Sequence, residues 1–262
     1  MFDTPKRALI TGASSGIGAA LAGRIARRGT EVWLCARRKD KLAEEVKLIE
    51  EAGGKAHAVE LDVADSDATH DKLRRLDRDV GGIDLVIANA GIGGDYVMGD
   101  FAKMPWASIK NIFNTNLLGA IATLDAFVPG MVERGHGQLV GISSLAADIH
   151  LPRGAAYNAS KAALTHYLES ADIDLRRRGV PVTIVHPGFV KTAMVDSLRE
   201  ATPFLMELDD AVEAIDRAIQ RKARMVRFPF PLAAVTLSAN ALPRGLRSWG
   251  VRMALKNAQK RS

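Results

Sequence analysis

A tyrosine and a lysine stand four residues apart in the segment Tyr157-Asn158-Ala159-Ser160-Lys161. Apolar residues recur at roughly helical spacing through residues 157–177, so both side chains are expected on one face of a helix. The ammonium of Lys161 would favour the phenolate of Tyr157, whose ordinary pKa is about 10. Such a pair suits general acid–base catalysis near neutral pH, although the same spacing also occurs on many solvated helices.

A glycine-rich segment near the amino terminus points to a second kind of chemistry. The apolar run Ala8-Leu9-Ile10 leads directly into Thr11-Gly12-Ala13-Ser14-Ser15-Gly16-Ile17-Gly18, and a helical pattern follows. A strand, a glycine turn and a helix in this order are typical of dinucleotide-binding proteins. The glycines allow close backbone approach, and the start of the helix offers unpaired N–H groups to a pyrophosphate.

These segments resemble the short-chain dehydrogenase/reductase family, in its ordinary single-domain branch. Ser144 lies thirteen residues before Tyr157, which is the usual spacing in the family. The resemblance covers residues 6–192 strongly and the remainder loosely. It is carried, in the family's order, by T-G-x-x-x-G-x-G at 11–18, N-A-G at 89–91, Asn116, Ser144, Y-x-x-x-K at 157–161 and P-G-x-V-x-T at 187–192.

The resemblance implies four catalytic residues. Tyr157 would exchange a proton with the substrate oxygen, and Lys161 would lower the pKa of the tyrosine and bind the nicotinamide ribose. Ser144 would hold the substrate oxygen, and Asn116 would position a water that links the lysine to solvent. Ser143 competes with Ser144 for the serine role, but it lies fourteen residues before Tyr157.

Two classes of function follow from these residues. The first is an NADP-dependent carbonyl reductase or alcohol dehydrogenase, and the second is a catalytically silent NADP-binding sensor or scaffold. The presence of all four catalytic residues favours the enzyme, because a silent relative has no reason to keep them.

The resemblance also implies a set of cofactor contacts, with one departure from the commoner form of the family, Ala88 in place of a second asparagine. The glycine turn would face the pyrophosphate, and Asp62 and Val63 would hold the adenine. Residues 89–91 would pass along the cofactor and steady the sheet, and residues 187–192 would hold the nicotinamide. The implied residues are Gly12, Ser14, Ser15, Gly16, Ile17 and Gly18; Asp62 and Val63; Asn89, Ala90 and Gly91; Tyr157 and Lys161; and Pro187, Gly188, Val190 and Thr192.

Charge after the second expected strand indicates which dinucleotide is used. Many NAD sites carry an acidic residue there for the ribose hydroxyls, but this chain has Ala36, followed by Arg37, Arg38 and Lys39. A guanidinium binds a ribose 2′-phosphate, which an acid would repel. NADP(H) is therefore the expected cofactor, with Arg37 the first choice for the phosphate contact and Arg38 the second.

Strand and helix patterns alternate along the whole chain, which predicts an α/β fold. We expect one domain, residues 1–262, built as a doubly wound, Rossmann-type parallel sheet of about seven strands with helices on both faces. The strands are expected near 7–11, 31–35, 56–61, 84–88, 138–143, 182–186 and 224–227, and helices near 40–52, 67–79, 106–133 and 210–222.

The composition indicates where in the cell the protein is expected and argues against disulfide bonds and a metal site. No apolar stretch approaches the ~20 uncharged residues of a membrane span, and the first strand begins too early to leave room for a signal peptide. The only cysteine, Cys35, lies in an apolar strand, where a core position is expected and no internal disulfide is possible. We therefore expect a cytoplasmic protein. The six histidines show no metal-ligand spacing, so no metal is expected.

The substrate is less well defined by the sequence. In the family, residues 193–206 form a lid, and the apolar side chains here suggest a lipophilic ketone, aldehyde or secondary alcohol, unless they only pack the lid itself. His150 and Arg153 would line a wall of the substrate site or lie on the surface. His186, at the end of a strand, is expected to be a hydrogen-bonded supporting residue.

The carboxyl-terminal extension, residues 217–262, carries eleven Lys or Arg and no Asp or Glu. It contains the apolar run 228–235, followed by Arg244, Arg247, Trp249 and Arg252. Such a segment could contact a membrane surface, cap the substrate site, or pack between subunits. It has no recognisable nucleic-acid motif. By resemblance, a homodimer or homotetramer is expected, paired through the helices that contain Asn116 and Tyr157.

Overall fold

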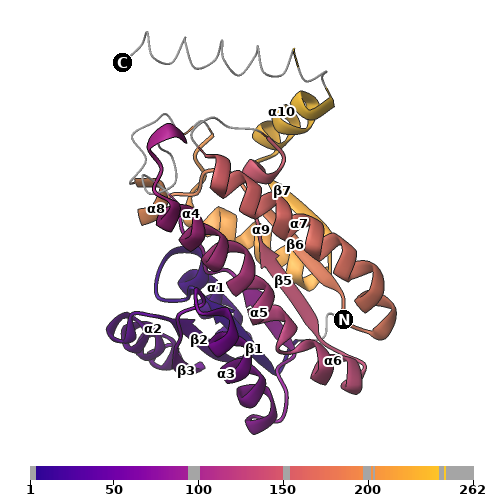
Figure 1. Ribbon diagram of the computed structural model, residues 1–262. Coiled ribbons are helices and arrows are strands. Elements are labelled where there is room, and N and C mark those ends of the chain that lie inside the picture. Colours follow the sequence, from indigo (N-terminus) through magenta and orange to yellow (C-terminus); the bar gives the residue numbers. More distant parts are fainter. Residues whose placement is uncertain are drawn as a thin grey trace.

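Seven strands form one parallel sheet in the order β3-β2-β1-β4-β5-β6-β7 (Figure 1). The computed structural model describes residues 4–93, 101–149, 154–196, 202, 204–241 and 245. The doubly wound, Rossmann-type fold is confirmed, and each predicted strand lies within one residue of the observed bounds. The strands are β1 (Arg7–Thr11), β2 (Glu31–Ala36), β3 (Lys55–Glu60), β4 (Leu85–Ala88), β5 (Gln138–Ile142), β6 (Val182–Pro187) and β7 (Met225–Phe228).

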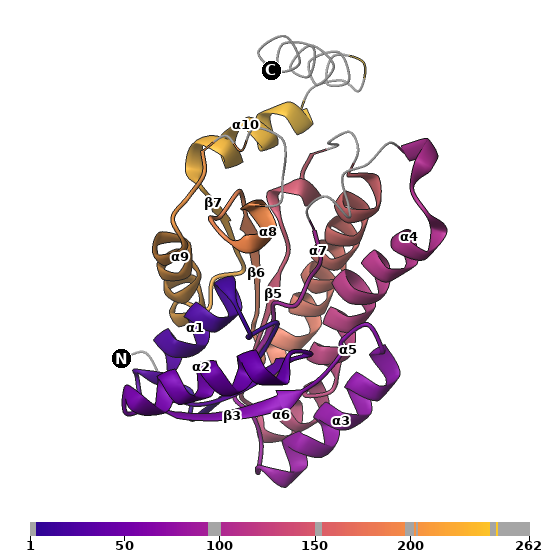
Figure 2. The same ribbon diagram turned by 90° about the vertical axis from the view of Figure 1, so that its left-hand side faces the viewer.

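Helices cover both faces of this sheet (Figure 2). One face is covered by α1 (Gly16–Ala26), α2 (Lys39–Glu51) and α9 (Leu208–Gln220). The other is covered by α3 (Ser66–Asp79), α5 (Gly119–Asp125), α6 (Val128–Arg134) and α7 (Ala155–Leu175).

Alternate strand residues supply the two hydrophobic cores. Ala8 and Ile10 of β1 pack into the core beneath α1, whereas Leu9 between them packs into the core beneath α7. Such alternation follows from the two-residue period of a strand. Because both faces are buried, the strands of a parallel sheet are nearly continuous apolar runs, which made them easy to locate in the sequence.

The helix predicted over residues 106–133 is broken. It consists of α4 (Trp106–Phe113), a π-helical turn η3 (Asn114–Leu118), α5 and α6. Pro129 stands in the first turn of α6, where its missing N–H needs no partner. Together, residues 106–134 are long and apolar enough to cross a membrane, but 56% of the most apolar window is buried within the protein, as in a core helix.

The remaining described elements are short or lie near the end of the chain. Three are 3-10 turns, one is a short helix after β6, and the last is a helix after β7. They are η2 (Phe101–Lys103), η4 (Leu145–Ala147), η5 (Arg176–Arg178), α8 (Ala193–Asp196) and α10 (Phe230–Ala241).

The strand order places a switch point between β1 and β4. From β1 the chain moves outward to β2 and β3, then returns to pair β4 on the other side of β1. The loops after β1 and β4 therefore leave the sheet in opposite directions and open a crevice at its carboxyl edge. In sheets of this type, ligands bind in that crevice.

Candidate active site

Asn89 joins the loops on the two sides of the switch point. Its side-chain amide donates to the carbonyl oxygens of Thr11, at 2.9 Å, and Gly12, at 3.3 Å. The Thr11 hydroxyl oxygen in turn accepts from the backbone N–H groups of Asn89 and Ala90. These bonds fix the glycine turn to the end of β4.

The glycine turn has room for glycine alone at two positions. A Cβ on Gly12 would lie 2.8 Å from the Ala90 Cα, and Gly12 itself has a φ of +67°. A Cβ on Gly18 would lie 2.4 Å from the Gly12 carbonyl oxygen. The helix α1 starts at Gly16, and the side chain of its N-cap Ser15 makes no capping hydrogen bond. The first N–H groups of α1 can therefore serve an anion.

Arg38 lies over this turn. Its Nη2 is 2.9 Å from the hydroxyl oxygens of both Ser14 and Ser15. Arg37, its exposed neighbour, follows β2 directly. The structure brings Arg38 to the turn, whereas the sequence analysis gave Arg37 as the first choice for the 2′-phosphate contact. Which arginine contacts that phosphate stays a prediction.

Asp62 and Val63 lie in the loop after β3, the edge strand that pairs with β2. Val63 is buried, and a Cβ on Gly119 would lie 2.2 Å from its carbonyl oxygen, so α5 approaches this loop closely. Asp62 is exposed, and its Oδ1 accepts from the Ala64 N–H. The carboxylate thus lies at the surface, within the loop expected to hold the adenine.

Asn116 is placed by the π-helical turn. Its Oδ1 accepts from the Ile92 N–H at 2.8 Å, and its Nδ2 donates to the Ile92 carbonyl at 3.0 Å. The side chain is fully buried. A Cβ on Gly91 would lie 3.3 Å from the Asn116 Oδ1 and 3.5 Å from the Lys161 Nζ, so Asn116 and Lys161 meet at this glycine. π-Helical turns are frequent at functional sites.

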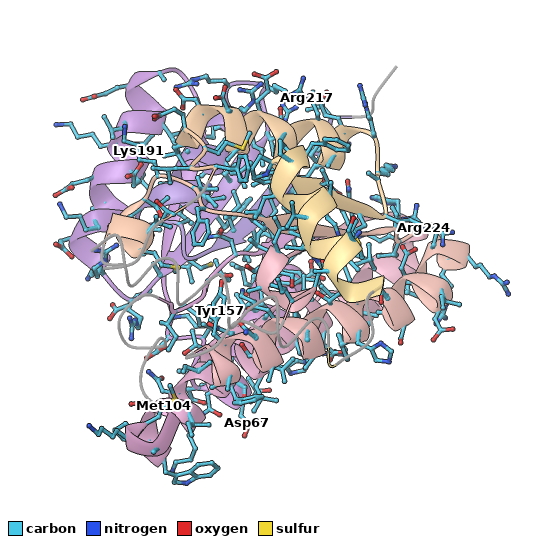
Figure 3. The ribbon with its side chains drawn as sticks, turned by 90° about the horizontal axis from the view of Figure 1, so that it is seen from above. Asp67, Met104, Tyr157, Lys191, Arg217 and Arg224 are labelled. Atoms are coloured by element: carbon cyan, nitrogen blue, oxygen red, sulfur yellow. The ribbon has the colours of Figure 1, made fainter. Side chains whose placement is uncertain are left out.

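Tyr157 lies in the first turn of α7 (Figure 3), and its side chain is hydrogen-bonded to that of Ser144, the N-cap of η4. Tyr157 packs against a small buried cluster that includes Ile112 of α4. This burial raises the pKa of Tyr157, and the Ser144 hydrogen bond only partly offsets it. Burial therefore sets the direction of the Tyr157 pKa shift, which is opposite to the lowering expected from Lys161.

Lys161 is buried, and its ammonium donates to the Ile142 carbonyl oxygen at 2.8 Å. The nitrogen lies 6.0 Å from the centroid of the Tyr157 ring, on the same face of α7 as predicted. Burial lowers the pKa of Lys161 to about 8. A cation removed from water in this way favours a nearby negative charge strongly.

Ser143 points away from Tyr157. Its hydroxyl donates to the Lys161 carbonyl oxygen at 3.0 Å and lies 2.7 Å from the Thr165 hydroxyl. The Ser144 hydroxyl, in contrast, accepts from the Ala146 N–H and reaches Tyr157. The geometry therefore favours Ser144 over Ser143 as the serine that contacts a substrate.

The segment after β6 faces the glycine turn from the other side. The Gly188 N–H donates to the Phe228 carbonyl at 2.7 Å, and Val190, which is buried, pairs with Met206. The position of a Cβ on Gly16 lies 3.4 Å from the Thr192 Cγ2. Pro187 ends β6, so residues 187–192 line the crevice opposite α1.

A buried network of hydrogen bonds lies behind these residues and centres on His186 and Asp148. His186 is fully buried; its Nε2 lies 3.2 Å from the Thr165 hydroxyl and its Nδ1 3.0 Å from Asp148. Arg227 of β7 donates to the same carboxylate at 2.8 Å. The supporting role predicted for His186 agrees with these bonds, but no sequence pattern identified Asp148 or Arg227, which lie 79 residues apart.

This network holds the serine turn. Ser144 is the N-cap of η4 and Asp148 its C-cap, so the two residues belong to one tight turn. Although burial raises the pKa of Asp148, hydrogen bonds and charge from His186 and Arg227 lower it to about 2. The carboxylate is ionised at neutral pH and ties the turn to β6 and β7.

The short helix α8 lies over Tyr157. A Cβ on Gly93 would lie 2.9 Å from the Met194 sulfur and 3.6 Å from Cε2 of Tyr157, so both side chains meet at this glycine. Phe204 and Leu205 are about half exposed. The rest of the expected lid, residues 197–201 and 203, lies outside the described residues, as do His150 and Arg153.

Two other expectations concern cysteine and metal chemistry. Cys35 is buried in β2, and burial raises its pKa to about 12, which leaves an inert thiol in the core as predicted. Within the part of the chain that the structure describes, no three His, Cys, Asp or Glu side chains are grouped to hold a metal ion.

Comparison with known proteins identifies the family. The short chain dehydrogenase family model matches residues 6–203. The chain belongs to the short-chain dehydrogenase/reductase family. An uncharacterized oxidoreductase of Myxococcus xanthus is 46% identical over 241 residues, which is 92% of this chain and 94% of that protein. The family resemblance predicted from the ordered motifs is thereby confirmed.

Solved structures of family members superpose over most of the chain. A metagenomic short-chain oxidoreductase in complex with NADP is 32% identical, with a TM-score of 0.71 over 85% of this chain and 96% of the other. A short-chain dehydrogenase from Sphingobium yanoikuyae in complex with NADPH is 28% identical, with a TM-score of 0.79 over 96% and 95%. The chain is an oxidoreductase of this family.

Burial of Lys161 predicts that the residue destabilises the fold. Its folded pKa of about 8 lies below the ordinary 10.5, so below pH 8 the charged lysine is buried at a cost of about 3 kcal/mol. The cost falls as pH rises through 8 and is gone above about 10.5. We expect Lys161→Met to raise the free energy of unfolding at pH 7 by about 1–3 kcal/mol, measured by urea denaturation.

The extra stability of the Lys161→Met variant should shrink as pH rises toward 10.5, because Lys161 then loses its proton in the unfolded wild-type protein as well. Lys55→Met, at an exposed site on β3, is the control and should change stability little. Equal stability of the Lys161 variant and wild type at pH 7 would contradict the prediction.

The Asp148 network predicts a second effect on stability and turnover. Because the folded pKa of about 2 lies below the ordinary 3.8, the carboxylate stabilises the protein above pH 4, and this is lost as pH falls through 2. Asp148→Asn should cost about 2 kcal/mol at pH 7, and should lower kcat through the loosened Ser144 turn. Asp125→Asn, which alters an exposed pair with His70, is the control; similar losses in both variants would argue against the network.

Proposed function

We propose that this protein is an NADP(H)-dependent oxidoreductase that interconverts a carbonyl group and an alcohol, with Tyr157 as the general acid or base. The observation that carries the proposal is the hydrogen bond between Tyr157 and Ser144, next to the buried ammonium of Lys161. The two hydroxyls converge on one point, where a substrate oxygen can accept from both.

The crevice residues fit a dinucleotide. Gly12 and Gly18 leave space that a Cβ would fill, and the N–H groups at the start of α1 suit a pyrophosphate. Arg38 and Arg37 supply cations where an acid would favour NAD, and Thr192 and Val190 face the turn from the opposite side. The NADP and NADPH complexes of the solved relatives support the same cofactor. A nicotinamide supplies or accepts the hydride when bound.

Residues of the protein donate the proton and stabilise the negative charge that develops on the substrate oxygen. In reduction, Tyr157 is protonated at neutral pH, since its pKa is raised, and it donates its proton to the carbonyl oxygen. Ser144 donates a hydrogen bond to the same oxygen and stabilises its negative charge in the transition state. Lys161 then stabilises the phenolate that remains. Asn116 ties the Ile92 segment to Ser160 of α7, the neighbour of Lys161 in the chain.

The substrate is proposed to be lipophilic. Met194 of α8 lies beside Tyr157, and Phe204 and Leu205 add apolar surface at the segment that follows. Pockets for small molecules are mostly lined by such side chains. A ketone, an aldehyde or a secondary alcohol with an apolar body fits both this surface and the two hydroxyls.

Lys161 also bears on the alternative of a silent NADP-binding protein. A lysine that destabilises the fold by its burial is retained at a place where it can stabilise a phenolate. Strongly perturbed groups of this kind gather at functional sites. A sensor or scaffold would gain nothing from the stability lost by burying Lys161, so a catalytic role is the better interpretation.

Replacement of the Tyr157 hydroxyl tests the mechanism. Tyr157→Phe should lower kcat by about 10²- to 10⁴-fold, because the proton donor is lost, while NADPH binding stays nearly unchanged. The assay is NADPH oxidation with a panel of aldehydes, ketones, steroids and acyl thioesters. Tyr167→Phe, on the exposed face of the same helix, is the matched control. Retention of most activity in the Tyr157→Phe variant would contradict the proposed mechanism.

Charge reversal at the two arginines tests the cofactor. Arg37→Glu and Arg38→Glu, singly and together, should weaken NADPH binding by about 10- to 100-fold and leave NADH binding unchanged or stronger. Dissociation constants from cofactor fluorescence would measure both. Lys55→Glu makes the same charge change at the amino end of β3 and should affect neither. Equal losses for both cofactors would mean that the arginines do not contact the 2′-phosphate.

A further inference from the structure

Helix α10 presents an apolar surface to solvent. Its sequence, FPLAAVTLSANA, contains no charged residue. Phe230 is 80% exposed, Val235 57% and Leu237 45%, whereas Ala233 and Thr236 on the inner side are buried. Three large exposed apolar side chains on one short helix are more than the scattered single residues that are normal for a protein surface.

This helix lies at the edge of the active-site crevice. The Leu232 Cδ2 would be 2.9 Å from a Cβ on Gly188, in the segment that follows β6. Figures 1 and 2 place α10 beyond β7, at the same end of the sheet as α8. Helix α10 therefore lies at the end of the molecule where the crevice opens.

The charge of the chain is divided very unequally around α10. Residues 217–262 carry eleven Lys or Arg and no Asp or Glu, and the whole chain carries +6, so residues 1–216 sum to −5. Six of the cations follow α10 in the sequence: Arg244, Arg247, Arg252, Lys256, Lys260 and Arg261. An apolar face is thus joined to a strongly cationic segment.

We propose that the exposed face of α10 docks on the surface of an anionic lipid bilayer. Apolar side chains on a helix, accompanied by basic residues without acidic ones, have the composition of an interfacial anchor. A second copy of the chain fits less well. A two-fold pairing of this face would join two copies in which α10 leads into a segment with six cations and no acidic residue.

Sedimentation with lipid vesicles tests the proposal. The full-length protein is incubated with vesicles of phosphatidylcholine alone, or of equal parts phosphatidylcholine and phosphatidylglycerol, at low and at high salt. We expect binding to the anionic vesicles at low salt, release at high salt, and little binding to phosphatidylcholine. Binding that ignores both lipid charge and salt, or no binding at low salt, would overturn the proposal.

Variants separate α10 from the general charge of the protein. Phe230→Glu with Leu237→Glu should weaken binding to anionic vesicles by about ten-fold or more. Leu48→Glu, which changes an equally exposed leucine on α2, should bind as wild type. Phe230→Ser is a milder second variant should the double variant fold poorly, and NADPH binding reports that the fold is intact. Wild-type vesicle binding by an intact Phe230 variant would overturn the role of α10.

Size-exclusion chromatography without lipid gives the competing outcome. A wild-type oligomer that dissociates in the α10 variants, together with no vesicle binding, would make this face an interface between copies and refute the membrane proposal. Because these measurements need no turnover, a negative result would leave the proposed oxidoreductase function untouched. Conversely, a protein that binds anionic vesicles but shows no turnover would support the membrane proposal and contradict the proposed oxidoreductase function.

Discussion

The pairing of β1 with β4 is the interaction on which the rest of the structure depends. Three register pairs, from Ala8↔Leu85 to Ile10↔Ile87, join parts of the chain that are 77 residues apart. This pairing creates the switch point, and Asn89 then locks the glycine turn to the end of β4. Because all strands are parallel, the ends of β5 and β6 arrive at the same edge, bringing Ser144 and residues 187–192 to the crevice. The chemistry is thus a consequence of strand order.

Most of the framework could be predicted from the sequence, for a definite physical reason. Strands buried on both faces are unbroken apolar runs, and the glycine turn leaves no other residue possible at Gly12 and Gly18. The helical spacing of Tyr157 and Lys161, and the identity of Ser144, follow from short-range patterns that the structure respects.

Other features depend on contacts between distant parts of the chain and gave no local signal. Burial sets the direction of the Tyr157 pKa shift, which spacing on a helix could not reveal. The carboxylate of Asp148 meets Arg227 across two strands, and Arg38 reaches the serines of the turn by a side-chain conformation that composition does not specify. The apolar run after β7 was recognised, but that it forms a helix with one side exposed became clear only in the fold.

The π-helical turn at Asn114–Leu118 has a consequence for how this helix can change. A π turn is an α-helix with one extra residue in its hydrogen-bonded loop, so α4 and α5 are rotated out of phase relative to one continuous helix. This phase offset brings one face of α4 beside Tyr157 while one face of α5 packs against the sheet. Removal of one residue from the turn would restore a regular helix and rotate one face out of place.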